Sequence, residues 1–313
     1  MNMREWALIL FTILTQMAVG SFLVLGFVHF FAKRKAGEVE ADNMSDRVLF
    51  AVGVVLILGM LASLFHLGNP ANAYRAVSNL GMSWLSREIL SLVLCLVFGG
   101  IFLIMQWRKI GSIAIRNAIA WIAAICGIAL VFSMANLYML ETQPTWNSLA
   151  TVVSFFVTTL LLGLLAIGSA LVANYAYLRR KAPDCADAQC DLLRGAIRWI
   201  AIASIVLLGI EFVMIPLYMG SLANNGGVAL KSLSMLVGEL SIVMVLRLAL
   251  AFLGAGIFSV FLYKYANSPG REKIMGNLVY GAFALVLIAE ILGRFLFYAT
   301  QTQIGIYDIH LRM

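Results

Sequence analysis

Charged residues, histidine and cysteine are all scarce in this chain. Of its 313 residues only 12% are charged while 62% are hydrophobic, and there are three histidines and four cysteines. A mean hydropathy of +0.96 excludes an ordinary soluble domain. Strand-like alternation is also absent, so a barrel is not expected. The long apolar runs are therefore predicted to be the helices of a polytopic membrane protein.

The cysteines are too few and too scattered to hold a metal cluster. Cys95 and Cys126 lie inside apolar runs, where a small residue serves packing. Cys185 and Cys190 share one connecting segment, but no further cysteine or histidine completes a zinc or iron–sulfur site there. We therefore expect no metal site, and the role of the Cys185 and Cys190 pair stays open.

Eight apolar runs are long enough to span a bilayer, for which roughly 20 helical residues suffice. Of the 22 lysines and arginines, fifteen fall in segments on one side of these runs and five on the other. The positive-inside rule places the fifteen in the cytoplasm and both termini outside, in the periplasm. The net charge of +7 then reflects topology and gives no reason to expect nucleic-acid binding. The runs cover residues 6–31, 48–67, 87–106, 117–140, 149–177, 198–219, 240–263 and 275–299.

The expected architecture is therefore an all-α bundle of eight transmembrane helices. No Pro-rich or Gly/Ser-rich linker divides the chain, so residues 1–313 are predicted to form a single integral membrane domain. The histidines do not fit a bis-histidine heme, since His29 falls at an inner helix end, His66 at an outer one, and His310 in the tail. We expect no redox centre within this chain, so electrons would have to leave to a partner protein.

A short polar stretch, SLFHLGNPANAYRAVSNLGMSWLSREIL (63–90), separates the second and third runs. Asn69 can cap a helix that has Pro70 at its first position, and Gly81 suits a helix end, which predicts a short outer-surface helix and loop over residues 69–82. Ser86 is then expected to cap the third helix, which places Glu88 in its first turn.

His66 and Glu88 stand at the two ends of this connection, at similar membrane depth. An imidazole and a carboxylate can accept protons and bind a hydroxyl, which suits oxidation of a hydroquinone. Tyr74 and Arg75 of the surface helix are further candidate contacts, with Arg75 helping to close or dock the site. The alternatives are that His66 only bonds backbone groups and that Glu88 only serves the helix dipole.

Other ionisable residues fall within the outer halves of the later runs, where buried charges are costly and often functional. Glu211 and Arg247 reach similar depths and could pair. Glu290 and Arg294 are spaced i, i+4 with the acid first, the favourable order for an ion pair on one helix. Glu239 is a further such charge. Purely structural pairing is the alternative for these supporting charges. The inner halves hold almost no buried charge, so no continuous ion path is expected.

Four short motifs, taken in order, resemble the membrane anchor subunit of the dimethyl sulfoxide reductase family, a heme-free subunit of bacterial molybdoenzyme complexes. They are HLGNP (66–70), LSREI (85–89), PTWNS (144–148) and AEILGRFLFY (289–298). With the eight spans, the resemblance covers nearly the whole sequence. The sequence departs from the family pattern in Arg87 and in longer cytoplasmic loops at 32–47 and 179–198.

The resemblance implies a menaquinol-oxidising anchor that draws on the quinone pool and holds an iron–sulfur subunit, which contacts a catalytic subunit with a molybdopterin cofactor. The family's quinol-site histidine and glutamate correspond to His66 and Glu88. The protein would then be the quinol-binding part of an oxidoreductase complex in anaerobic respiration, with its terminal acceptor left open.

Two other functions remain open at this point. A proton or solute transporter is favoured by buried carboxylates on several helices, and opposed by their restriction to one leaflet. A passive anchor, in which the polar groups only dock partner subunits, is the second. Uptake by the purified protein in liposomes would favour the transporter, whereas binding of a quinol analogue that depends on His66 would exclude the passive anchor.

Overall fold

A computed structural model describes residues 3–65, 79–181, 186–268 and 270–302. Within these ranges the regular structure is entirely helical, and eight helices are long and apolar enough to cross a membrane. The predicted all-α class and the eight spans are thus confirmed. Seven spans are α1 (Met3–Ala36), α2 (Glu38–Leu64), α4 (Trp84–Arg108), α5 (Ile113–Tyr138), α6 (Leu149–Lys181), α7 (Ala186–Asn225) and α11 (Glu272–Ala299). The remaining span joins α9 (Ser241–Ala251), the π-helix η4 (Phe252–Phe258) and α10 (Ser259–Ala266).

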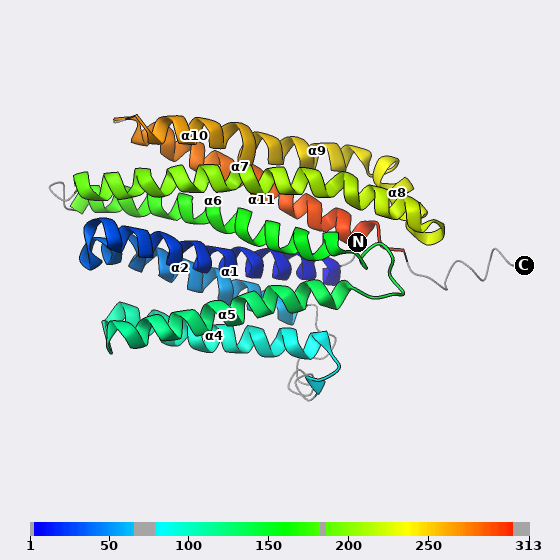
Figure 1. The fold of residues 1–313 in the computed structure, drawn as a ribbon, viewed down its shortest axis with the longest axis horizontal. Helices are drawn as coiled ribbons and strands as arrows, with labels where there is room; N and C mark the ends of the chain where they lie inside the picture. The colour runs from blue at the N-terminus through cyan, green and yellow to red at the C-terminus, as the bar shows by residue number, and fades with distance from the viewer. Residues whose placement is uncertain (1–2, 66–78, 182–185, 269, 303–313) are drawn as a thin grey trace, which may run out of the picture.

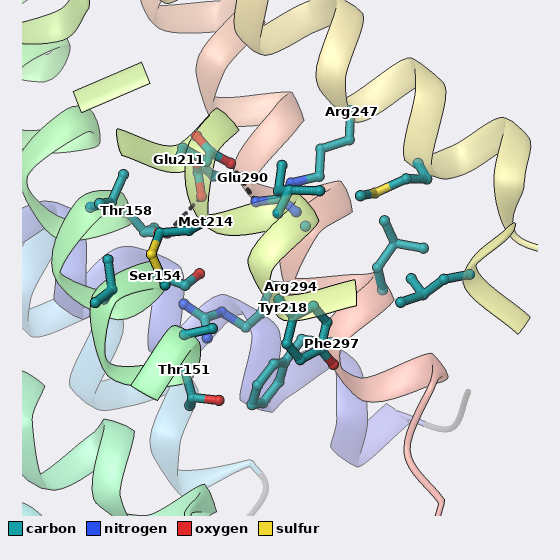
Figure 2. A pocket seen from close by; sticks show the side chains of 18 of the residues that line it. Thr151, Ser154, Thr158, Glu211, Met214, Tyr218, Arg247, Glu290, Arg294 and Phe297 are labelled. Atoms are coloured by element: carbon teal, nitrogen blue, oxygen red, sulfur yellow. Dashed lines mark hydrogen bonds and ion pairs between the residues drawn. The ribbon is translucent and has the colours of Figure 1, made fainter. Parts of the chain in front are cut away.

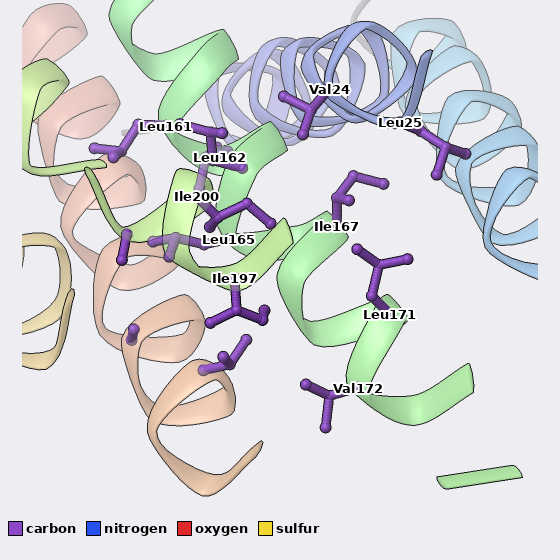
Figure 3. Close-up of a cluster of buried hydrophobic side chains, with 14 of the residues drawn as sticks. Val24, Leu25, Leu161, Leu162, Leu165, Ile167, Leu171, Val172, Ile197 and Ile200 are labelled. Carbon is purple, nitrogen blue, oxygen red and sulfur yellow. The ribbon is translucent and has the colours of Figure 1, made fainter. Parts of the chain in front are cut away.

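The helices lie side by side along the long axis of the molecule (Figure 1). Helices α1 and α6 occupy the centre, since 67% and 61% of their most apolar windows are buried, against 17% for α4. The largest apolar cluster joins α1, α2, α6, α7, α10 and α11, and Figure 3 shows its leucine, isoleucine and valine side chains meeting between α1, α6 and α7. The lipid-facing helices therefore pack around a two-helix centre.

The segments at 32–47 and 179–198, which were expected to be loops, are mostly helical over their described residues, so this expectation was wrong. Only Gly37, at φ 87°, separates α1 from α2, because glycine tolerates the left-handed region at little cost. Helix α6 continues to Lys181 and α7 begins at Ala186. Alanine, glutamate, lysine and arginine are good helix formers, so these helices continue past the apolar runs.

A further helix, α8 (Gly227–Val237), precedes α9 and was not predicted from the sequence. Its 11 residues are too short to span a bilayer, because a helix rises about 1.5 Å per residue. Its Ala229 and Leu236 pack in one apolar cluster with Leu222 of α7 and Leu296 of α11. The seventh expected span, predicted over 240–263, accordingly begins at α9.

Helices α1 and α6 approach most closely at two glycines. A methyl group added at Gly163 would overlap the backbone of Gly20, and one added at Gly20 would overlap the carbonyl of Thr159. Small residues permit this kind of backbone contact between membrane helices, where close packing replaces the hydrophobic effect as the driving force. The glycine pair therefore sets the separation of the two central helices.

The substitution Gly163→Ala should lower the free energy of unfolding by roughly 1–3 kcal/mol or more, because the backbones of α1 and α6 must move apart. The loss should appear as a lower midpoint in thermal or denaturant unfolding of the purified protein. Gly26→Ala is the matched control, since Gly26 is exposed and an added methyl group meets nothing within 4 Å. Equal stability of the two variants would contradict the proposed role of this contact.

Candidate functional site

Glu88 lies in the second turn of α4 and not, as expected, in the first. The helix is capped by Ser83, whose hydroxyl accepts from the Ser86 amide at 3.3 Å, so the expected Ser86 cap was wrong. An earlier helix start leaves Glu88 deeper in the bundle, with 6% of its surface exposed. Its Oε2 has no hydrogen-bond partner among the described residues. Glu88 is thus a buried carboxylate with an open acceptor atom.

The other expected quinol contacts, His66, Tyr74 and Arg75, lie outside the described residues. Of the predicted surface segment 69–82, only its last four residues are described, and they form a short turn. Arg87 stabilises this turn with two hydrogen bonds. Its Nε donates to the Leu80 carbonyl at 2.9 Å and its Nη2 donates to the Gly81 carbonyl at 2.7 Å. Its guanidinium also lies 4.2 Å from the centre of the Trp84 ring. Arg87 therefore stabilises the turn that leads into α4.

Two tyrosines, one buried and one partly buried, lie near Glu88 and were not predicted as site residues. The hydroxyls of the buried Tyr138 on α5 and the partly buried Tyr298 on α11 are 2.6 Å apart, and both lie within electrostatic range of Glu88. The ring of Trp146 packs edge-on against Tyr138 and stacks on Phe297, and its Nε1 donates to the Phe297 carbonyl at 2.8 Å. An aromatic cluster with hydroxyl groups thus adjoins the carboxylate.

Arg294 and Gln16 continue this polar region through the centre of the bundle. Arg294 Nη2 donates to Gln16 Oε1 at 2.8 Å, while Gln16 Nε2 donates to the Phe155 carbonyl at 3.0 Å. The guanidinium carbon lies 3.9 Å from the centre of the Phe155 ring. A cation on an aromatic face, away from water, gains more than an exposed one. Arg294 therefore joins α11 to both central helices.

The expected ion pair between Glu290 and Arg294 does not form; both residues are described and no salt bridge joins them. Glu290 Oε2 instead accepts from the Thr158 hydroxyl at 2.7 Å. An ion pair within one helix contributes only about 0.2–0.5 kcal/mol, whereas burial leaves every polar atom in need of a partner. Each side chain therefore bonds to a different neighbouring helix.

The expected pairing of Glu211 with Arg247 is confirmed. Arg247 Nη2 donates to Glu211 Oε1 at 2.5 Å, and the side chains are 13% and 8% exposed for Arg247 and Glu211. This pair borders a cavity of about 100 Å³ between α6, α7, α9 and α11. Figure 2 shows Arg247 reaching toward Glu211 and Glu290. Glu239, also expected among the buried charges, is exposed in the turn between α8 and α9.

A second polar cluster occupies the opposite end of the bundle and was missed. Lys109 Nζ lies 2.7 Å from Asp42 and 2.8 Å from Asp46, and Gln106 bonds to both aspartates and to the buried Arg116. Within this cluster Arg116 is buried, Asp42 and Asp46 are partly buried and Lys109 is exposed, so the expectation of almost no buried charge at this end agrees with the described residues. Partial burial disfavours the Lys109 ammonium, but its hydrogen bonds to the aspartates outweigh that effect and raise the pKa of Lys109.

Cysteine chemistry gives no sign of a metal centre in the described ranges. Cys190 is a free thiol whose Sγ lies 3.5 Å from Glu272 Oε1, and Cys185 lies outside the described residues. No group of three or more histidine, cysteine or acidic side chains that could hold an ion occurs in the described part of the protein. The ligand-binding capacity of the described residues thus rests on carboxylates, arginines and tyrosines.

Eight spans with a buried polar region toward one end define a multi-pass helical membrane protein. The chain belongs to the DMSO reductase anchor subunit family (DmsC), whose model matches residues 1–300. This confirms the resemblance drawn from the four motifs, and with it the role of membrane anchor.

Individual relatives agree with this family. One is a component of the anaerobic dimethyl sulfoxide reductase of Haemophilus influenzae, 27% identical over 307 residues with 97% of both proteins covered. Another is the YnfH component of an anaerobic dimethyl sulfoxide reductase of Escherichia coli, 27% identical over 305 residues with 96% of both covered. A shorter match, 29% over 187 residues, is to one subunit of the sulfite dehydrogenase of Allochromatium vinosum, and it covers 55% of the present sequence and 54% of that subunit.

Proposed function

We propose that this anchor binds menaquinol near the outer face of the bacterial inner membrane and passes its electrons to an iron–sulfur subunit. That subunit would serve a catalytic subunit with a molybdopterin cofactor, as in a dimethyl sulfoxide reductase-type complex in anaerobic respiration. The names of the relatives favour such a complex, because they are components of dimethyl sulfoxide reductases and a sulfite dehydrogenase.

The observation that carries the proposal is the buried carboxylate of Glu88 with its open Oε2. An ionisable group in a transmembrane helix is costly and is a functional candidate by default. A carboxylate oxygen is an acceptor that a hydroquinone hydroxyl can satisfy, and the nearby Tyr138 and Tyr298 hydroxyls offer further polar contacts. This group of residues suits a small aromatic diol with an apolar body.

Oxidation of a hydroquinone to the quinone releases two electrons and two protons. In this proposal Glu88 and His66 each accept one proton, and the electrons leave to the partner's iron–sulfur cluster. Tyr74 and Arg75 would contact the ring from the segment that precedes α4. The anchor itself then contributes binding, orientation and proton acceptance, and the partner supplies the redox centre.

An apolar cavity beside α4, the helix that carries Glu88, supports this placement of the head group. It measures about 90 Å³ and lies between α1, α2, α4 and α5. The α4 residues at 95, 96, 99 and 103 line it, and Glu88 lies on their face of the helix, since steps of three or four residues lead from 88 through 92 to 95. The cavity would hold part of an isoprenoid tail whose head group is at Glu88.

The charge distribution supports an outward position for Glu88. The cluster around Lys109 and Arg116, and the basic ends of α1 and α6, lie at the end of the bundle opposite the start of α4. By the positive-inside rule, that end faces the cytoplasm. Glu88, Tyr138 and Tyr298 then face the periplasmic side, where the partner subunits would dock.

The substitution His66→Asn tests the proposal directly. Asparagine can form hydrogen bonds but does not accept a proton near neutral pH, so oxidation of a menaquinol analogue by the assembled complex should fall about 10²-fold or more. Partner subunits should still co-purify, and turnover with an artificial donor that reduces the catalytic subunit directly should stay unchanged.

His29→Asn is the matched control, because His29 lies at the other end and bonds Ser45 at 2.9 Å. Its quinol oxidation should match that of the wild type. Full turnover in the His66 variant would contradict the assignment of His66. Binding of a quinol analogue that is insensitive to both His66 and Glu88 would favour a passive anchor.

A further inference from the structure

The cavity between α6, α7, α9 and α11 contains polar atoms that no contact in the described protein satisfies. Glu211 is 7% exposed and Glu290 3% exposed, and both line this space. Glu211 Oε2, Glu290 Oε1 and Arg247 Nε have no hydrogen-bond partner among the described residues. Buried polar atoms are rarely left unpaired in native proteins, so these three atoms point to a bound group.

The charges around the cavity restrict what that group can be. Two carboxylates, Glu211 and Glu290, lie close enough to act on each other, and two guanidinium groups, Arg247 and Arg294, share the lining. A simple anion would meet the carboxylates, and a simple cation would meet the arginines. A zwitterion satisfies both sets, because its ammonium can donate to the open carboxylate oxygens and its anionic part can accept from Arg247 Nε.

The position of the cavity points to the membrane as the source of the group. Met214 and Ile215 of α7 and Met244 of α9 line it. Their sequence neighbours are strongly exposed apolar residues, Val213 at 61% and Val245 at 65%, as expected of lipid-facing surface. Pro216, which lacks a backbone N–H, lies inside α7 next to this lining, and the π-helix η4 follows α9.

The open oxygens of the two carboxylates select the kind of ammonium group. Glu211 Oε2 and Glu290 Oε1 both need a hydrogen-bond donor. A primary ammonium has three N–H donors, whereas the quaternary ammonium of choline has none.

We propose that this cavity binds the zwitterionic head group of a membrane lipid with a primary ammonium, the chemistry of phosphatidylethanolamine. The ammonium lies between Glu211 Oε2 and Glu290 Oε1, and the phosphate accepts from Arg247 Nε. The lipid thereby completes a polar site between α7, α9 and α11. This site is separate from Glu88 and does not depend on quinol oxidation.

The test uses the assembled complex, delipidated and reconstituted with phosphatidylethanolamine and phosphatidylcholine of identical acyl groups. Native mass spectrometry should find phosphatidylethanolamine retained in preference to phosphatidylcholine. Glu290→Gln and Glu211→Gln should each weaken that retention roughly tenfold or more, because a charge-assisted hydrogen bond is lost. Glu239→Gln, which changes an exposed carboxylate between α8 and α9, should leave lipid retention as in the wild type.

Helix content and co-purification of the partner subunits establish that each variant is folded. Equal retention of the two lipids by the wild type would overturn the proposal, as would unchanged selectivity in both glutamate variants. Retention of a quinone in place of a lipid, lost in these variants, would also overturn it. A quinol-oxidation defect in Glu88 or His66 variants has no bearing on this outcome.

Discussion

Replacing Glu88 with glutamine should reduce menaquinol-dependent turnover of the assembled complex by about 10²–10⁴-fold, the usual contribution of a positioned proton acceptor. Glutamine has nearly the shape of glutamate and can still accept a hydrogen bond, but it cannot take up a proton. Glu88 is buried in the second turn of α4, beyond the cap at Ser83, so the substitution leaves the helix start intact. The measurement is oxidation of a menaquinol analogue, with the artificial-donor activity of the catalytic subunit as internal reference.

Glu141→Gln is the matched control for this variant. Glu141 lies in the turn after α5, at the same end of the bundle, and is exposed. Its substitution removes an equal charge without touching the buried region around Tyr138, so turnover should be unchanged. If Glu88→Gln oxidises quinol at the wild-type rate, Glu88 is not a proton acceptor.

Replacing Arg247 with methionine should lower the free energy of unfolding by about 3–5 kcal/mol, the cost of leaving a buried charge without its partner. Glu211 keeps its position on α7 and loses the only ion pair that the described structure gives it. The measurement is denaturant or thermal unfolding of the purified protein in detergent. Arg180→Met, at an exposed site near the end of α6, should change stability by much less.

The double variant Glu211→Gln, Arg247→Met separates pairing from packing. Replacing both partners removes the unpaired charge, so most of the lost stability should return. If the double variant is as unstable as the sum of the two single variants, the two side chains do not interact energetically. That outcome would contradict the structural role assigned to the pair.

The eight spans were predictable because apolar length is a strong signal that does not depend on neighbouring helices. The ends of the helices were not predictable in the same way. The charged segment at 32–47 was expected to be a loop, yet it is helical except at Gly37, since charged residues with high helix propensity can extend a helix into water. Helix α8 was missed because 11 residues carry no spanning signal.

Side-chain partners across the bundle were harder to predict than the spans. Glu211 and Arg247 were correctly paired because both fall at the same depth on neighbouring spans. Tyr138 and Tyr298 lie 160 positions apart, and a tyrosine in an apolar run does not reveal which helix it faces. Glu290 accepts a hydrogen bond from Thr158 of α6 and does not pair with Arg294 on its own helix, because contacts between helices outweigh the i, i+4 spacing.

Arg87 and Glu88 are adjacent in the sequence, but only one of them secures the start of α4. The Arg87 side chain holds the preceding turn through two carbonyl groups and the face of Trp84. The carboxylate of Glu88 therefore does not take part in stabilising the turn before α4. The cap at Ser83 and the contacts of Arg87 hold the start of the helix without the Glu88 side chain, so the chemistry of position 88 is separate from the way the backbone enters α4.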